Sequence, residues 1–239
     1  MNPGDGDVKT TVIGATLNEI EAVQVVLPAL ANSGVDEIII VDGGSTDGTV
    51  QYCEKNGFTV LHHRGGGYGS AIKAAVAAAT GDIVIEFPPD GNSMVEKIPD
   101  VVAEIRKGYD FVIVSRYKDG AKSYDDDFMT AIGNRMFTGM TNFMFGTNYT
   151  DVLVGYRAYR RSAFFELELD SPGLSWPAQE AIRFATYGFK VGEIGGDEPK
   201  RIGGQRKMRI FATGFEILFL LFREYLRHRC LKKKQRETA

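Results

Sequence analysis

The sequence predicts an α/β protein with a mainly parallel central sheet flanked by helices. Short continuous apolar runs, typical of strands buried on both faces, alternate through residue 117 with segments whose apolar residues recur at helical spacing. This β-α-β-α-β-α-β-α-β order builds a right-handed, mainly parallel sheet. No Ser- or Pro-rich linker divides the chain. We therefore expect one domain over residues 1–209, with halves at about 9–117 and 118–209, followed by a terminal helix and basic tail over 210–239.

The elements of the first half follow one another in order. Residues 9–18, "KTTVIGATLN", are rich in β-branched side chains and predict the first strand. The helix that follows ends at Gly34, and Pro28 inside it predicts a kink. The remaining segments are expected as a strand over 36–45, a helix over 46–57, a strand over 58–63, a helix over 70–81, a strand over 82–87, a helix over 94–108 and a strand over 109–117.

The second half is less regular. A polar loop follows residue 118, then a helix over about 128–145, then the segment "DVLVGYRAYRR". Irregular segments of this kind often carry substrate contacts. The terminal segment places Phe211, Phe215 and Phe222 at helical spacing before a strongly basic tail. Such a helix can lie at a lipid surface or pack on the core or on another subunit, and both interpretations stay open.

Composition excludes some classes of protein. The net charge of −3 argues against a dedicated nucleic-acid binder, whose phosphate contacts need a basic excess. Cys53 and Cys230 are far apart, so we expect no disulfide framework and a reducing, cytosolic setting. The start lacks the pattern of a secretion signal, and no run reaches the roughly 18–20 apolar residues of a spanning helix.

Acidic and amide side chains gather where the predicted strands end. Ligands of open parallel sheets bind beyond the carboxyl ends of the strands, so the residues just after each strand are the candidates. They suit the ribose and base of a nucleotide together with a divalent cation. These residues are Thr16, Asn18, Glu19, Asp42, Gly43, Ser45, Gly69, Ser70, Asp90, Asn92 and Arg116.

Several of these residues also have a purely structural interpretation. Asp47 is best interpreted as a helix cap, whereas Asp42, at the end of a buried strand, is better interpreted as a ligand. Asp90 follows two prolines and could form only a turn, or could hold a hard cation together with Asn92. The glycine run at 65–69 matches neither the dinucleotide-binding nor the Walker pattern, but suits a backbone passing close to a phosphate or sugar.

The motifs together resemble family 2 glycosyltransferases of the GT-A fold, particularly the dolichol-phosphate mannose synthases and polyprenyl-phosphate glycosyltransferases. The resemblance covers residues 11–207 and rests on "TLNE", "IIIVDGGSTDGT", "GGGYGSAIKAA", "GDIVIEFPPDGN", "IVSRY", "DVLVGYRAYRR" and "GDEPKRIGGQRK" in this order. It departs from the family pattern at Pro88, where the first aspartate of a DxD signature is expected, and at Asn92.

The resemblance implies roles for individual residues. Asp90 matches the last aspartate of the DxD signature and, with Asn92, is the expected Mg²⁺ or Mn²⁺ site. Glu19 and Asp42 match nucleoside contacts, and Gly69 lies in the turn that borders the donor. The basic residues expected to hold phosphates are Arg116, Arg135, Arg201 and Lys207. Asp90, Arg116 and Arg201 are therefore the expected catalytic residues.

The implied activity is transfer of a hexose from UDP- or GDP-hexose to a polyprenyl phosphate, with inversion, at the inner face of a membrane. Such an enzyme belongs to cell-envelope or glycan biosynthesis and could be a homo-oligomer. An acceptor hydroxyl would instead need a carboxylate base, for which Asp151 or the run 125–127 is available, although a solvated loop is the favoured interpretation of that run. A nucleotidylyltransferase or a non-catalytic sugar-nucleotide-binding module are the further alternatives.

Overall fold

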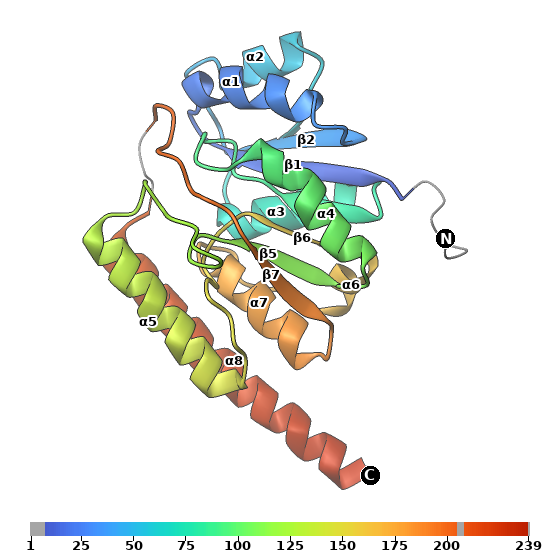
Figure 1. The fold of residues 1–239 in the computed structure, drawn as a ribbon, viewed down its shortest axis with the longest axis vertical. Coiled ribbons are helices and arrows are strands. Elements are labelled where there is room, and N and C mark those ends of the chain that lie inside the picture. Colours follow the sequence, from blue (N-terminus) through green and yellow to red (C-terminus); the bar gives the residue numbers. More distant parts are fainter. Residues whose placement is uncertain (1–7, 205–207, 239) are drawn as a thin grey trace.

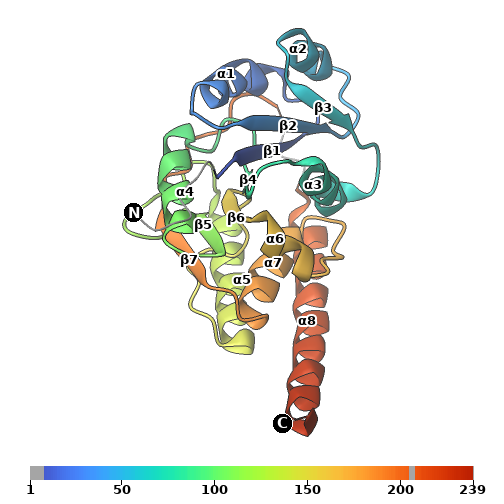
Figure 2. The same ribbon diagram turned by 90° about the vertical axis from the view of Figure 1, so that its right-hand side faces the viewer.

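The computed structural model of the protein describes residues 8–204 and 208–238, with side chains through residue 231. In this part of the chain seven strands form one sheet in the order β3-β2-β1-β4-β6-β5-β7 (Figures 1 and 2). The strands are β1 (Thr10–Thr16), β2 (Glu37–Asp42), β3 (Thr59–His62), β4 (Ile83–Glu86), β5 (Phe111–Ser115), β6 (Arg157–Arg160) and β7 (Val191–Gly195). Only β6 runs antiparallel to its neighbours among these strands, which confirms the mainly parallel sheet.

Helices connect the strands in the predicted alternation through β5. They are α1 (Ile20–Ala31), α2 (Thr49–Lys55), α3 (Gly67–Ala78), α4 (Ile98–Arg106), α5 (Phe128–Phe145), α6 (Arg161–Glu166), α7 (Trp176–Thr186) and α8 (Ile210–Thr238), with a 3₁₀ turn over Val95–Lys97. α3 begins three residues before the predicted start at 70, because left-handed Gly65 and Gly66 turn the chain into it. The predicted helix over 94–108 is a 3₁₀ turn followed by α4, whose second residue is Pro99.

The core lies on both faces of the central strands. All residues of β4 and β5 are buried, as their continuous apolar runs predict, whereas the edge strand β3 is partly exposed. α3 packs on β1 and β2, and α4 packs on β5 and β6. Figure 2 shows these two helices on opposite faces of the sheet.

A second helical layer lies below the sheet and is formed by α5 and α8, which run side by side with α7 adjacent (Figures 1 and 2). Phe137 from α5, Ile182 from α7, and Ile217 and Leu221 from α8 form its own small apolar cluster. The C-terminal part of α8 extends beyond the rest of the molecule (Figure 1). No helix among the described residues is long and apolar enough to cross a membrane.

Candidate active site

Two adjoining cavities lie at the edge of the sheet where the parallel strands end. The first, of about 610 Å³, is bordered by the ends of β1, β2 and β4 and by the start of α3. The second, of about 250 Å³, lies between the end of β5, the loop before α5, and the first turns of α5 and α8. Six residues border both cavities: Tyr68, Pro88, Asp90, Leu174, Arg201 and Met208. Ligands in the two cavities would therefore meet beside Asp90 and Arg201.

The predicted nucleotide-binding residues divide into three groups. Thr16, Glu19, Gly43 and Asp90 line the first cavity. Gly69 and Ser70 belong to α3, and the others join the loops that follow β1 and β2. Asn18 Oδ1 accepts a hydrogen bond from Thr46 N at 2.8 Å, and Asn18 N donates to Ser45 Oγ at 2.8 Å.

Asp42 and Asp47 both accept hydrogen bonds from backbone amides. The Asp42 carboxylate, only 2% exposed, accepts from Gly44 N at 2.8 Å and Ser45 N at 3.0 Å. Asp47 accepts from Thr49 N and Ile20 N, both at 3.0 Å, and so serves the first turns of α2 and α1. The residue at the N-cap position of α2 is Gly48, so Asp47 caps from one position earlier than expected. Asp42 therefore fixes the conformation of the loop after β2, which borders the first cavity.

Gly69 and Ser70 lie behind the glycine turn and do not line either cavity. Gly69 N donates to Pro172 O at 2.9 Å, and a Cβ at this position would lie 2.2 Å from Ser171 O. Glycine is therefore required here for close packing of α3 on the loop before α7. Ser70 Oγ bonds His63 Nε2 at 2.8 Å. It is Gly65 and Gly67 that line the first cavity.

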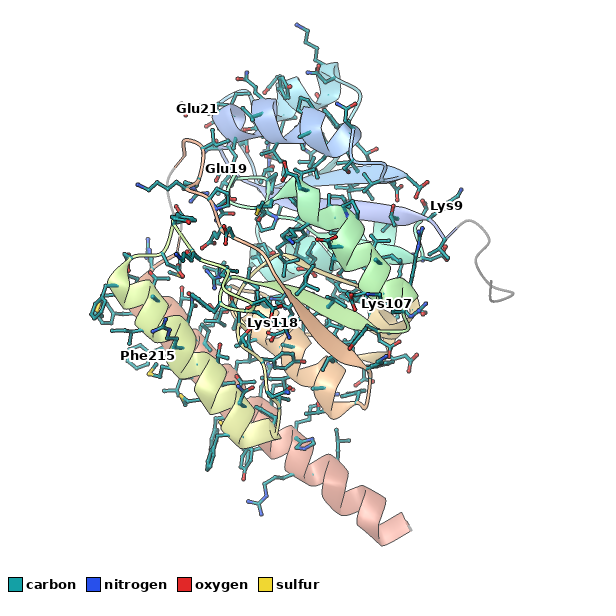
Figure 3. All side chains as sticks on the ribbon, viewed as in Figure 1. Lys9, Glu19, Glu21, Lys107, Lys118 and Phe215 are labelled. Carbon is teal, nitrogen blue, oxygen red and sulfur yellow. The ribbon has the colours of Figure 1, made fainter. Side chains whose placement is uncertain are left out.

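Glu19, Asp90 and Arg201 come together although they are far apart in the sequence. Arg201 Nη2 lies 2.9 Å from Asp90 Oδ2 and 3.2 Å from Glu19 Oε1. Figure 3 shows Glu19 beside the loop that follows β7 and carries Arg201. Burial raises the pKa of the Asp90 carboxyl, and the Arg201 guanidinium opposes that rise. Arg201 Nε is buried and has no hydrogen-bond partner among the described residues.

The oxygen atoms around Asp90 fit a hard cation only as a partial ligand set. Asn92 lies beside Asp90, donating from its backbone N to Asp90 Oδ1 at 3.4 Å. No cluster of three or more His, Cys, Asp or Glu side chains that could hold a metal occurs in the described ranges. One carboxylate and one amide oxygen suit Mg²⁺ or Mn²⁺ when a substrate diphosphate and water complete the coordination.

Arg116 lies at the centre of an acidic cluster rather than free in the second cavity. Its Nε and Nη2 donate to Asp151 at 2.6 and 3.0 Å, and its Nη1 lies 3.4 Å from both Glu198 and Asp126. These carboxylates raise the pKa of Arg116 against the effect of burial, and burial raises the pKa of Glu198. Glu198 was not predicted as a site residue, although the motif "GDEPKRIGGQRK" contains it.

The interpretation of residues 125–127 as a solvated loop is wrong for Asp126. Its side chain is only 5% exposed and accepts hydrogen bonds from Tyr117 Oη at 2.5 Å and Asn134 Nδ2 at 3.2 Å. Asp127 caps α5 by accepting from Thr130 N at 2.8 Å. Asp151, the other candidate base, is fully buried against Arg116 and lines neither cavity.

One further predicted phosphate-binding residue, Arg135, does not line either cavity. Arg135 is exposed on α5, with its guanidinium 5.9 Å from the centre of the Tyr117 ring. Its neighbour Asn134 lines the second cavity instead. Lys207 lies outside the described residues.

Comparison with known proteins decides the family. The model of glycosyl transferase family 2 matches residues 11–167. The chain belongs to glycosyltransferase family 2, and the resemblance noted in the sequence is confirmed. A dolichyl-phosphate hexose transferase of Haloferax volcanii is 32% identical over 209 residues, which cover 86% of this chain and 89% of that protein. An undecaprenyl-phosphate mannosyltransferase of Micrococcus luteus is 27% identical over 215 residues, which cover 84% of this chain and 88% of that protein.

A third relative is longer than this chain. Glycosyltransferase AglJ of Haloferax volcanii is 30% identical over 184 residues, and the match spans 75% of this chain but only 59% of AglJ. Among solved structures, a glucosyl-3-phosphoglycerate synthase of Mycobacterium tuberculosis, crystallised with Mn²⁺, UDP and phosphoglyceric acid, has a TM-score of 0.74. At 20% identity over 91% of this chain and 78% of that one, the likeness shows the GT-A fold alone.

Proposed function

We propose that this family 2 enzyme transfers a hexose, with inversion, from UDP- or GDP-hexose to a polyprenyl phosphate. The observation that carries the proposal is the pair of cavities that meet at Asp90 and Arg201. A nucleotide sugar in the first cavity would present its anomeric carbon to an acceptor in the second. The names of the relatives that act on dolichyl or undecaprenyl phosphate support this choice of acceptor.

The donor site combines the loops after β1 and β2 with a divalent cation and the guanidinium of Arg201. The loops after β1 and β2 would hold the nucleoside against Thr16, Glu19 and Gly43. Asp90 and Asn92 would hold a divalent cation on the diphosphate, where it neutralises charge on the leaving group. Arg201 would then turn from Asp90 to the phosphates, since a guanidinium matches phosphate oxygens.

A phosphate acceptor fits the second cavity better than a hydroxyl acceptor. A hydroxyl needs a general base, but the carboxylates of Asp126 and Asp151 are both engaged with Arg116. Asp125, which also lines the second cavity, accepts a hydrogen bond from Arg201 N at 3.3 Å. A phosphate is already an anion and needs no base. Because three carboxylates surround Arg116, we place this phosphate beside Arg201, whose Nε is a spare donor.

The lipid part of the acceptor has an apolar surface nearby. Thr130 of α5 and Ile217 of α8 line the second cavity, so its mouth opens where these helices begin. Both helices expose large apolar side chains: Phe128, Ile132, Met136 and Phe143 on α5, and Phe211, Phe215, Phe219 and Phe222 on α8. We name these exposed side chains of α5 and α8 the apolar face. Figure 3 shows Phe215, which belongs to it. With the basic tail, this face would bind the cytoplasmic surface of an anionic membrane.

The proposal is tested with purified protein, first by thermal shift and then by transfer. UDP-glucose or GDP-mannose with Mn²⁺ is expected to raise the melting temperature, because a ligand that binds only the folded state stabilises it. The stabilising nucleotide sugar is then incubated with polyprenyl phosphate in anionic vesicles, with Asp90→Ala as the comparison. Loss of transfer in Asp90→Ala with an unchanged melting temperature supports the proposal. Wild-type protein that binds no nucleotide and transfers no sugar would overturn it.

A further inference from the structure

Tyr68 occupies the junction of the two cavities. It is the second residue of α3 and borders both the first and the second cavity, together with Pro88 and Asp90. Its hydroxyl lies 3.4 Å from the position that a Cβ on Gly155 would take, so Gly155 leaves space around it. No hydrogen bond joins this hydroxyl to another of the described residues, so it can bond a ligand.

Buried carboxyl groups behind Tyr68 fix its protonation state. Glu86, Glu180 and Arg157 are all fully buried, with Arg157 Nη1 at 3.2 Å from Glu180 Oε2. Glu86 accepts a hydrogen bond from Tyr159 Oη at 2.9 Å, and Asp90 lies on the side of the cavities. Desolvation and these acidic neighbours raise the pKa of Tyr68 well above its ordinary value, while Arg157 acts in the opposite direction. The phenol is accordingly a neutral hydrogen-bond donor throughout the physiological range.

The position of Tyr68 decides which part of the substrate suits it. The proposed function places the sugar where the two cavities meet, and Tyr68 borders both cavities at that point. A phenol offers an apolar ring and a polar tip, which suit the C–H face and the hydroxyl groups of a hexose. The phosphates are assigned to Arg201 and to the cation that Asp90 would hold.

We propose that Tyr68 recognises the transferred hexose, with its hydroxyl donating a hydrogen bond to a sugar hydroxyl where the two cavities meet. This inference rests on the proposed function and adds a specificity residue to it. Tyr68 contacts the sugar and neither the nucleoside nor the diphosphate. Its substitution therefore affects the binding of a nucleotide sugar and leaves the binding of the free nucleotide unchanged.

The test compares Tyr68→Phe with wild type and with Tyr52→Phe by calorimetric titration in Mn²⁺. Tyr52 lies on α2, outside both cavities, and loses the same hydroxyl in the control. The probes are UDP and GDP alone and the nucleotide sugars UDP-glucose and GDP-mannose. Tyr68→Phe is expected to bind the preferred nucleotide sugar about fivefold to tenfold more weakly, the effect of one lost hydrogen bond. Its affinity for the matching free nucleotide, which also reports correct folding, is expected to stay within about twofold.

Each other outcome contradicts the inference. If wild type binds a nucleotide sugar and Tyr68→Phe binds it equally well, Tyr68 makes no bond to the sugar. Equal weakening of the nucleotide and the nucleotide sugar would place the contact on the nucleotide or reveal a structural role. If wild type binds none of the four probes, the proposed function fails, and this inference fails with it.

Discussion

Arg116 and Arg201 carry the same charge at the same edge of the sheet, but their surroundings give them different tasks. Arg116 is paired with Asp151, Asp126 and Glu198, so its charge is already neutralised and it organises the wall of the second cavity. Arg201 contacts Asp90 and Glu19 and keeps one buried N–H without a partner among the described residues. Arg201 is therefore the guanidinium that can turn to a phosphate.

Glu198 gives a pH-dependent prediction. Burial raises its folded-state pKa above the ordinary value of 4.5, so the folded protein holds this proton more tightly than the unfolded chain. Its contribution to stability is thus fully present below about pH 4.5 and is lost as the pH rises through the raised pKa. Glu198→Gln, which stays neutral, is expected to show a smaller fall of melting temperature between about pH 4.5 and pH 7 than wild type. Parallel melting curves for the two proteins over this range would refute the assignment.

The positions of the candidate residues were predictable from the sequence, but their partners were not. Thr16, Glu19 and Asp90 line the first cavity because each follows a strand whose apolar run is unmistakable. The partners of Arg116 come from 35 and 82 residues further along the chain, at Asp151 and Glu198. Such distant pairs depend on tertiary packing, which local patterns do not contain.

At the scale of the elements, the same limit explains the second half of the chain. β6 has four residues, "RAYR", and lies between β4 and β5 in antiparallel register. Its alternation is too short to predict a strand, and pairing on both sides stabilises it instead. The first five strands and four helices were predictable because short apolar runs alternate with helical spacing and glycine stop signals through residue 117. The exposed apolar stripe on α5 was not predicted, because the sequence does not show which apolar side chains of a helix stay exposed to solvent.

The apolar face gives a prediction for membrane binding. Phe215 is 72% exposed on α8, and Phe215→Glu places a charge on a side chain expected to enter the lipid interface. Losing a buried phenylalanine costs roughly 1.5–3 kcal/mol, so vesicle affinity is expected to fall by about tenfold to a hundredfold. Val25→Glu is the matched control, because Val25 is 58% exposed on α1, away from this face. Co-sedimentation with phosphatidylglycerol vesicles measures both, and equal binding of both variants would rule out this face.

The contact of α8 with the body gives a prediction for stability. Arg183 of α7 donates to Glu224 of α8 at 3.0 and 2.7 Å, and both side chains are almost completely buried. Glu224→Ala leaves a buried guanidinium short of its partner and is expected to cost about 3 kcal/mol of unfolding free energy. Glu168→Ala removes an exposed partner of Arg227 and is expected to cost less than about 1 kcal/mol. Urea unfolding compares the two, and a similar small loss in both would show that this pair does not hold α8.

At the scale of the whole molecule, the sheet edge, the two cavities and the apolar face form one continuous arrangement. The parallel strands end at the first cavity, the second cavity adjoins it at Asp90, and the beginnings of α5 and α8 border the second cavity. A nucleotide sugar would thus enter from the aqueous side while a lipid phosphate enters from the apolar face. In this proposal the two substrates meet where the two cavities adjoin.

Mass spectrometry of the lipid products distinguishes a phosphate acceptor from a hydroxyl acceptor. Anionic vesicles carrying either polyprenyl phosphate or the matching polyprenol, which lacks the phosphate, are incubated with the enzyme, Mn²⁺ and the preferred nucleotide sugar. Because the candidate bases Asp125, Asp126 and Asp151 are all engaged with neighbouring groups, we expect a hexose on polyprenyl phosphate and none on polyprenol. Hexose transfer to polyprenol at a comparable rate would contradict the account.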